Sequence, residues 1–182
     1  MAPAVPGIRR FTTAEAAPGL LSEIRALLDT AFAGAFSDDD WDHACGGWHV
    51  TVTDGPALVA HAAVVPRTLE VGAWAVPTGY VEEVATTPGR QGEGLGSLAM
   101  TEVAAIVQDG GFAMGALSTG RHGFYERLGW ERWQGPTFVR EGGERRRTEE
   151  EDDGIMVLRF GLTGAVDVRQ PLTCAARGGD DW

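Results

Sequence analysis

The segment Gln91-Gly92-Glu93-Gly94-Leu95-Gly96 carries the pattern that decides the fold of this 182-residue chain. It follows an apolar run over 79–85 that is typical of a strand, and it opens a helical stripe that starts at Leu95. Glycines let the backbone approach a ligand closely, and a helix N-terminus offers N–H groups and a positive dipole. The segment therefore predicts a pyrophosphate site, although a purely structural glycine turn would use the same residues.

Two common nucleotide-binding motifs do not fit this segment. No Gly-Lys-Ser or Gly-Lys-Thr follows it, which argues against a P-loop. Its glycine spacing also differs from the dinucleotide-binding fingerprint. The ligand has to be identified from the wider sequence.

Apolar periodicity predicts the elements on both sides of the segment. Helices are expected over 20–32, 37–41, 95–107 and 121–128, and strands over 48–54, 57–65, 68–76, 79–85, 112–118 and 155–160. A turn is expected at Gly72 within 68–76, and Ser37 is expected to be the N-cap of the second helix. The charged stretch 140–153 is expected to be an exposed loop and 161–182 a largely irregular tail that contributes to the acceptor site. This order predicts an α+β fold (α/β with a mixed antiparallel and parallel sheet flanked by helices) in one domain over 1–182.

Charge and composition narrow the class of partner. Lys plus Arg number 15 against 26 Asp plus Glu, which gives a formal charge of −11. Such a surface repels nucleic acid and anionic lipid and attracts a cationic small molecule. Two cysteines, Cys45 and Cys174, lack metal-ligand spacing, and no run of about 18 apolar residues occurs. We therefore expect a soluble cytoplasmic protein without a metal.

The chain resembles the GCN5-related N-acetyltransferases (GNAT) in two places. Gln91-x-x-Gly94-x-Gly96 matches the family's glycine turn, and Phe124-Tyr125 with Leu128-Gly129-Trp130 matches a second family motif. The resemblance implies that acetyl-CoA is the acetyl donor and that its pyrophosphate lies on Gln91, Gly92, Glu93, Gly94, Leu95 and Gly96. It also implies that the strand at Val84 and Thr86 binds the pantetheine arm.

A resemblance to the aminoglycoside 2′-N-acetyltransferases covers nearly the whole chain. It is carried by the segments AFAGAFSDDDWDHACGG, AHAAVV, GYVEEVA, GALST, LGW, WQGPT, EDDG and the terminal GGDDW. It implies acetylation of the 2′ amine of an aminoglycoside, loss of antibiotic action and a homodimer.

The chemistry of amine acetylation asks for a base, a proton donor and an oxyanion site. The amine must be neutral before it attacks a thioester, and Glu82 is the best candidate for the base. Neighbouring strand residues face opposite sides, so we expect Glu82 rather than Glu83 to line the pocket. The hydroxyl of Tyr125, which matches a family tyrosine, is assigned to the leaving thiolate, and the main-chain N–H of Val84 to the oxyanion.

A polycationic acceptor calls for clustered carboxylates. The resemblance assigns this role to Asp40, Asp152, Asp180 and the terminal carboxylate of Trp182, with Ser118 as a polar contact. Trp41 is a candidate for the pocket rim, and Glu82 and Glu83 are both candidates for substrate contact, of which Glu82 is favoured.

Three departures from the family pattern fall at the expected acceptor site. Glu83 replaces a glycine, Ala35 replaces an aspartate of a relative, and the stretch between Leu117 and Tyr125 is shorter by two residues than in that relative. They predict a narrower range of acceptors, for which compact kasugamycin is as suitable as gentamicin or tobramycin.

Other functions remain open from the sequence. The same fold serves acetyltransferases for polyamines, amino acids or protein N-termini, and a silent acetyl-CoA-binding sensor would share the glycine turn. The four histidines, His43, His49, His61 and His122, lack the spacing of metal ligands. No cysteine is suitably placed as a nucleophile, which favours direct transfer in a ternary complex.

Overall fold

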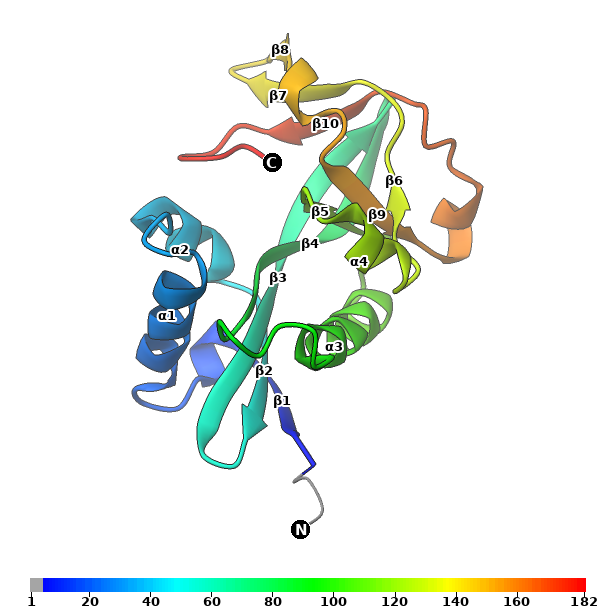
Figure 1. Ribbon diagram of the computed structural model, residues 1–182. Coiled ribbons are helices and arrows are strands. Elements are labelled where there is room, and N and C mark those ends of the chain that lie inside the picture. The colour runs from blue at the N-terminus through cyan, green and yellow to red at the C-terminus, as the bar shows by residue number, and fades with distance from the viewer. Residues whose placement is uncertain (1–4) are drawn as a thin grey trace. The chain divides into compact units, whose positions relative to one another are not determined.

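A turn at Gly72 and Ala73 joins two long strands, β3 (Ala57–Val71) and β4 (Trp74–Thr86), in the computed structural model, which describes residues 5–182 (Figure 1). Gly72 adopts a φ of 60°, the left-handed conformation that glycine accepts at little cost. Both strands contribute to two compact units. These are Met1–Val65 with Val81–Ile106, and Pro66–Tyr80 with Val107–Trp182.

The first unit begins with strand β1 (Gly7–Thr12), which pairs antiparallel with β2 (Trp48–Asp54), and β2 pairs antiparallel with β3. A short 3-10 helix, Thr13–Glu15, follows β1. Helices α1 (Leu20–Ala31) and α2 (Asp38–Ala44) lie on one side of these strands and α3 (Leu95–Asp109) on the other (Figure 1). The three helices match the stripes predicted over 20–32, 37–41 and 95–107.

The core of the first unit joins helix α1 to the sheet. Ile24 and Leu28 are completely buried and pack in one cluster with Phe11, Phe36 and Ala85. Burial of an aliphatic side chain of this size contributes about 1.5–3 kcal/mol relative to leaving it in water. The three-and-four spacing of the apolar residues in α1 thus fixes the face that the helix presents to the strands.

The second unit holds a mixed sheet in the order β6-β9-β5-β4-β3-β10-β7-β8. Its strands besides β3 and β4 are β5 (Met114–Ser118), β6 (Glu131–Arg132), β7 (Thr137–Glu141), β8 (Glu144–Arg147), β9 (Ile155–Arg159) and β10 (Leu172–Ala175). Helix α4 (His122–Glu126) and the 3-10 helices Glu149–Glu151 and Gly161–Ala165 connect them. The pairs β4–β5 and β10–β7 are parallel, which confirms the predicted mixed sheet.

The stretch 140–153 is not a loop throughout, contrary to the expectation from its charge. Gly142 and Gly143, with φ of 54° and 89°, turn the chain between β7 and β8, which pair antiparallel. All four residues of β8 are exposed on an edge strand, so this strand has no apolar face that a sequence pattern could show. The guanidinium of Arg145 lies 4.1 Å from the ring centre of Phe138 and covers it.

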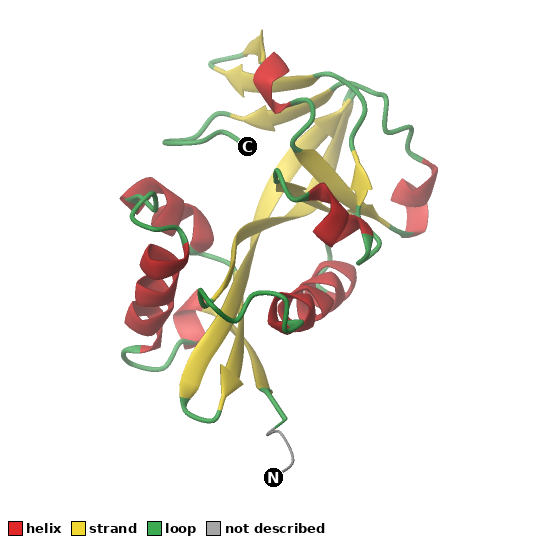
Figure 2. Ribbon diagram, viewed as in Figure 1, coloured by secondary structure: helices red, strands yellow, loops and turns green. Residues whose placement is uncertain are grey.

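The C-terminal tail and the region before it also differ from the expected boundaries. Strand β10 pairs with β3 and β7, so part of the predicted irregular tail belongs to the sheet (Figure 2). The expected strand over 68–76 divides at Gly72, where a turn was predicted, into the end of β3 and the start of β4. Strand β1 lies in a segment for which no element was predicted.

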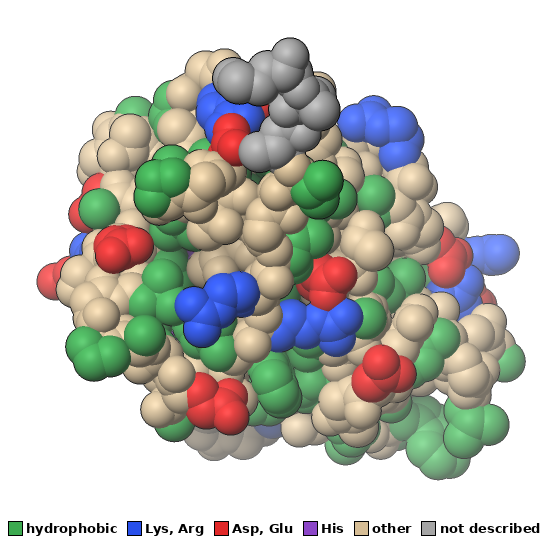
Figure 3. Space-filling view, turned by 90° about the horizontal axis from the view of Figure 1, so that it is seen from below, with side chains coloured by type: hydrophobic (Ala, Val, Ile, Leu, Met, Phe, Trp, Pro, Cys, Tyr) green, Lys and Arg blue, Asp and Glu red, His purple; other side chains and the backbone are tan. Residues whose placement is uncertain are grey.

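On the face drawn in Figure 3, acidic and basic side chains are interspersed among apolar ones, so the net negative charge is not gathered there into one field. No helix within residues 5–182 is long and apolar enough to cross a membrane.

Candidate functional site

The residues assigned from the sequence divide between the two units. The first unit holds Asp40, Trp41, Glu82, Glu83, Val84, Thr86 and the glycine turn 91–96, and the second holds Ser118, Tyr125, Asp152, Asp180 and Trp182.

The glycine turn lies between the end of β4 and the start of α3, where the sequence predicted it. Gly92 and Gly94 adopt φ of 87° and 84°, and a Cβ placed on either would meet no other atom within 4 Å. The carbonyl of Gly94 accepts the N–H of Leu98 at 3.1 Å, so the helical hydrogen bonds begin at Gly94. The N–H groups of the first turn of α3 therefore lie beside an open, side-chain-free stretch of backbone.

Arg90 stabilises this turn. Its guanidinium donates to Asp54 of β2 at 2.8 Å and to Glu93 at 2.7 Å, and its N–H donates to the carbonyl of Thr87 at 3.0 Å. A free Glu93 carboxylate would repel a phosphate group, and the ion pair with Arg90 offsets that charge. Arg90 was not among the residues assigned from the sequence, because an arginine in a polar loop carries no periodic signal.

The end of β4 is irregular at the predicted catalytic residues. Glu82 is buried, with 8% of its surface exposed, whereas Glu83 and Val84 are half-buried. Glu83 has a φ of 52°, a left-handed conformation that is uncommon for a residue other than glycine. A left-handed residue interrupts the alternation of a strand, so alternation alone does not select Glu82 over Glu83.

Asp40 and Trp41 lie at the start of α2. The carboxylate of Asp40 accepts hydrogen bonds from the N–H and the hydroxyl of Ser37, each at 2.8 Å, while the Ser37 hydroxyl accepts the N–H of Asp40. This reciprocal pair is a capping box, in which Ser37 is the N-cap of α2. The guanidinium of Arg25 lies 5.7 Å from the ring centre of Trp41, within the range of a cation–π contact.

Tyr125 is buried in helix α4, with 7% of its surface exposed, and packs edge-on against Phe124 and Trp130. Burial raises the pKa of its hydroxyl to about 12, although the charge of Arg121 and a hydrogen bond with Thr119 lower that pKa in part. The hydroxyl therefore keeps its proton at neutral pH and can donate it. Ser118, at the end of β5, is exposed.

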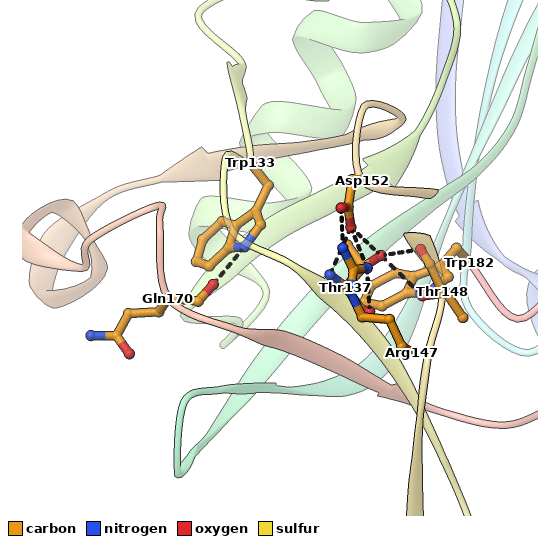
Figure 4. A network of polar contacts seen from close by, with 7 residues as sticks. All are labelled: Trp133, Thr137, Arg147, Thr148, Asp152, Gln170 and Trp182. Atoms are coloured by element: carbon orange, nitrogen blue, oxygen red, sulfur yellow. Dashed lines mark hydrogen bonds and ion pairs between the residues drawn. The ribbon is translucent and has the colours of Figure 1, made fainter. Parts of the chain in front are cut away.

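Asp152 and Trp182 belong to one polar network of the second unit (Figure 4). The carboxylate of Asp152 accepts from Arg147 and from the N–H and hydroxyl of Thr137, each Thr137 donor at 2.9 Å. Thr148 donates to the hydroxyl of Thr137 at 2.9 Å and accepts the indole N–H of Trp182 at 3.2 Å. Asp152 is thus linked through two threonines to the ring of the last residue.

The charge state of Asp152 follows from these contacts. Its hydrogen bonds with Arg147, more than those with Thr137, lower the pKa of the carboxyl from 3.8 to about 2. Both carboxylate oxygens accept hydrogen bonds within the unit, which fits a structural role for Asp152 as well as the predicted contact with an acceptor.

A further carboxylate, Glu151, was not assigned from the sequence. Burial and the charges of Asp180, Glu150 and Asp181 raise the pKa of this carboxyl. Burial is the larger cause and the neighbouring negative charges are the smaller one, and a cation near Glu151 would favour its ionised form. The acidic run 149–153 contained the signal, but charge alone does not show which of its residues are partly buried.

Among the described residues, no group of three or more His, Cys, Asp or Glu side chains could hold a metal ion.

Comparisons with known proteins agree with the geometry of the turn. A model of acetyltransferase (GNAT) domains matches residues 13–133. The chain is 41% identical over 162 residues to an aminoglycoside 2′-N-acetyltransferase from Mycolicibacterium fortuitum. The matched region covers 87% of this chain and 83% of that protein.

Solved structures share the fold at low sequence identity. YhbS from Escherichia coli, a GNAT family N-acetyltransferase in complex with CoA, has a TM-score of 0.68 and 18% identity, with 96% of this chain and 92% of that chain covered. A GNAT family acetyltransferase from Brucella melitensis in complex with acetyl-CoA has a TM-score of 0.61 and 20% identity, with 86% and 89% covered.

Proposed function

This chain belongs to the acetyltransferase (GNAT) family, and on that premise we propose that it transfers an acetyl group from acetyl-CoA to the 2′ amine of an aminoglycoside antibiotic. The observation that carries the proposal is the 41% identity over most of both chains to an enzyme of that activity. The expected consequence for a cell is resistance to the antibiotic.

The glycine turn suits the pyrophosphate of acetyl-CoA. The left-handed backbone at Gly92 and Gly94 and the space where their Cβ atoms would lie leave room for phosphate oxygens beside the first N–H groups of α3. Gln91, Leu95 and Gly96 complete that contact, and the β4 backbone at Val84 and Thr86 is assigned to the pantetheine arm. Bound acetyl-CoA supplies the acetyl group as an activated thioester.

Three groups of this chain are assigned to the transfer step. Glu82 accepts the proton of the attacking amine, directly or through water, as the new C–N bond forms. The N–H of Val84 donates to the thioester oxygen, on which negative charge develops. As the C–S bond breaks, the hydroxyl of Tyr125, which is protonated at neutral pH, donates its proton to the leaving sulfur.

A covalent acetyl-enzyme is not part of this proposal. Burial raises the pKa of the Cys174 thiol to about 11 and also raises that of Cys45. The thiolate is the nucleophilic form of cysteine, so both residues are poor nucleophiles at neutral pH. Direct transfer between the two bound substrates is the simpler route.

The acidic groups of the second unit support a polycationic acceptor. The negative charge of Asp180 is felt at the partly buried carboxyl of Glu151, and an ammonium group beside them would be held by charge-assisted hydrogen bonds. We assign the acceptor contacts to these two residues, to the terminal carboxylate of Trp182, to Ser118 and Asp152, and in the first unit to Asp40, Trp41 and Glu83.

The departures at Glu83 and Ala35 bear on which aminoglycoside is used. Glutamate in place of glycine adds bulk and charge, so we propose a narrower range of acceptors, with kasugamycin a candidate beside gentamicin and tobramycin. We further propose that the enzyme acts in the cytoplasm as a homodimer.

The test is turnover with acetyl-CoA and a panel of aminoglycosides, followed by NMR to locate the acetyl group. Acetylation of the 2′ amine is the expected result. Acetylation at a 3 or 6′ amine, or of none of the 2′-amino antibiotics, would overturn the proposal in favour of a polyamine, amino acid or peptide acceptor. Binding of acetyl-CoA without any turnover would favour a sensor.

A further inference from the structure

A chain of buried hydrogen bonds crosses the first unit and ends at the predicted catalytic strand. The hydroxyl of Thr13 lies 2.9 Å from Nε2 of His49, Nδ1 of His49 lies 3.0 Å from Nε2 of His61, and Nδ1 of His61 lies 3.1 Å from the carbonyl oxygen of Glu83. Both histidine side chains are fully buried. The chain links the start of the unit through β2 and β3 to β4.

The Glu83 carbonyl, at the end of this series of hydrogen bonds, fixes the direction of each bond in the series. A backbone carbonyl only accepts, so Nδ1 of His61 carries a hydrogen and donates it to Glu83. In neutral His61 the other ring nitrogen, Nε2, then accepts from Nδ1–H of His49, whose own Nε2 accepts from the hydroxyl of Thr13. That hydroxyl in turn accepts the N–H of Gly46 at 3.0 Å.

Both imidazoles are neutral at physiological pH. Burial lowers the pKa of His49 to about 4, and burial together with the charge of a protonated His49 lowers that of His61 to about 3. This series of hydrogen bonds does not act as a proton wire, because its last member is an amide carbonyl that does not take up a proton at physiological pH. Its effect is to hold an atom in place.

The atom that it holds belongs to a strained residue. The left-handed φ of Glu83, 52°, is unfavourable for any residue other than glycine because of the close approach of its Cβ to the backbone. Such a conformation persists only where the surroundings fix it, and the hydrogen bond from His61 to the carbonyl of Glu83 is one such constraint. The same peptide group ends in the nitrogen of Val84, so the orientation of the Glu83 carbonyl also sets that of the Val84 N–H.

We propose that His61, supported by His49 and Thr13, is a positioning residue for acetyl transfer, because its hydrogen bond to the Glu83 carbonyl orients the Val84 N–H and the neighbouring Glu82. The inference deepens the proposed function and rests on it for the roles of Val84 and Glu82. It gives a function to two buried polar side chains that the transfer step itself does not use.

Two amide substitutions at one position separate positioning from packing. In His61→Asn the side-chain N–H₂ occupies the place of Nδ1 and can still donate to Glu83. In His61→Gln the amide reaches instead toward His49, and the bond to Glu83 is lost. We expect the glutamine variant to lose about ten- to a hundred-fold in kcat with KM for acetyl-CoA within about twofold, and the asparagine variant to keep most of kcat.

Stability is controlled with a core variant away from the hydrogen-bond chain. Ile24→Val removes one buried methylene in the same unit and is expected to lower stability modestly without changing kcat of the folded enzyme. Equal kcat losses in the asparagine and glutamine variants, or wild-type kcat in the glutamine variant, would overturn the inference. If the glutamine variant does not fold, His61→Leu replaces it.

Amide hydrogen exchange tests the inference without any acceptor. Exchange at Val84 is expected to be faster in His61→Gln than in wild type, with exchange in α1 unchanged, whereas unchanged exchange at Val84 would overturn the inference. This measurement remains decisive if no aminoglycoside is acetylated, so failure of the proposed function and failure of the positioning role can be told apart.

Discussion

The two units differ in the groups that hold their candidate site residues. In the first unit, left-handed glycines, helix N–H groups and the neutral pair His49–His61 shape the backbone from β4 to α3. In the second unit, the ion pair of Arg147 with Asp152 and a pair of threonines hold the ring of Trp182. Backbone geometry thus builds the proposed donor site, whereas side-chain charge supports the proposed acceptor site.

This difference predicts how each unit responds to change. A backbone site fails when a residue cannot adopt the required φ, whatever its polarity. A side-chain site fails when a hydrogen-bond partner or a charge is lost, with the backbone intact. The following variants separate the two kinds of failure.

The largest effect is expected at the glycine turn. Gly94→Val places a branched side chain in the space proposed for the pyrophosphate, and acetyl-CoA binding should weaken by more than about a hundred-fold, or 2.7 kcal/mol. Gly111→Val is the matched control, because Gly111 has a similar φ of 81° with open space around its Cβ but lies beyond the end of α3. Calorimetry showing wild-type affinity in folded Gly94→Val would contradict the donor site.

The next effect concerns the proton donor of the second unit. Tyr125→Phe keeps the ring and its contacts with Phe124 and Trp130, so stability should change little. Loss of the hydroxyl should lower kcat by about ten- to a thousand-fold. Steady-state kinetics decide this, and wild-type turnover in the variant would remove Tyr125 from the transfer step.

A smaller effect is expected at the C-terminus. One glycine appended after Trp182 displaces the terminal carboxylate and leaves the indole on Thr148. KM for the aminoglycoside should rise by about tenfold, the effect of one charge-assisted hydrogen bond, with KM for acetyl-CoA unchanged. Deletion of Trp182 should be more severe because it also removes the buried ring. Equal KM values for the extended and native chains would show that the carboxylate makes no acceptor contact.

Acid should weaken the two units in separate pH ranges. The depressed pKa values of His49 and His61 mean that the unfolded chain binds more protons between pH 6.5 and about 4, so stability falls as pH falls through that window. Within that window each histidine lowers the free energy of unfolding by at most about 1.4 kcal/mol for each pH unit of acidification. Above pH 6.5 the free energy of unfolding no longer depends on their protonation.

Asp152 acts at lower pH. Its pKa is depressed to about 2, so its contribution is present above the ordinary value of 3.8 and is lost as pH falls toward 2. Because the pair with Arg147 is partly exposed, its effect should be smaller and should shrink in high salt. Urea denaturation at several pH values measures both windows, and a stability that stays constant from pH 6.5 to 4.5 would contradict neutral buried histidines.

The sequence predicted best what depends on local backbone chemistry. The glycine turn, the capped helix α2 and the stripes of α1 and α3 are confirmed, because each needs particular residue types at fixed spacing. The GNAT resemblance drawn from Gln91–Gly96 is confirmed by the family match. Tertiary partners were not predictable: His49 and His61 are twelve residues apart and meet only because β2 and β3 pair.

Long-range contacts account for the errors as well. The charged strand β8 was expected to be a loop, since an exposed edge strand lacks apolar alternation. The family resemblance assigned Asp152 only a contact with the acceptor. Its contacts with Arg147 and Thr137 became visible only in the folded structure. The roles of Glu82, Val84 and Tyr125 stay predictions.

The most direct test of the central claim compares two aminoglycosides that differ at one position. Kanamycin B has an amine at the 2′ carbon, and kanamycin A has a hydroxyl there. With acetyl-CoA and purified protein, release of CoA is measured with each. We expect kanamycin B to be acetylated and kanamycin A not to be. Acetylation of both at similar rates would show that the enzyme acts on another amine and would rule out 2′ specificity.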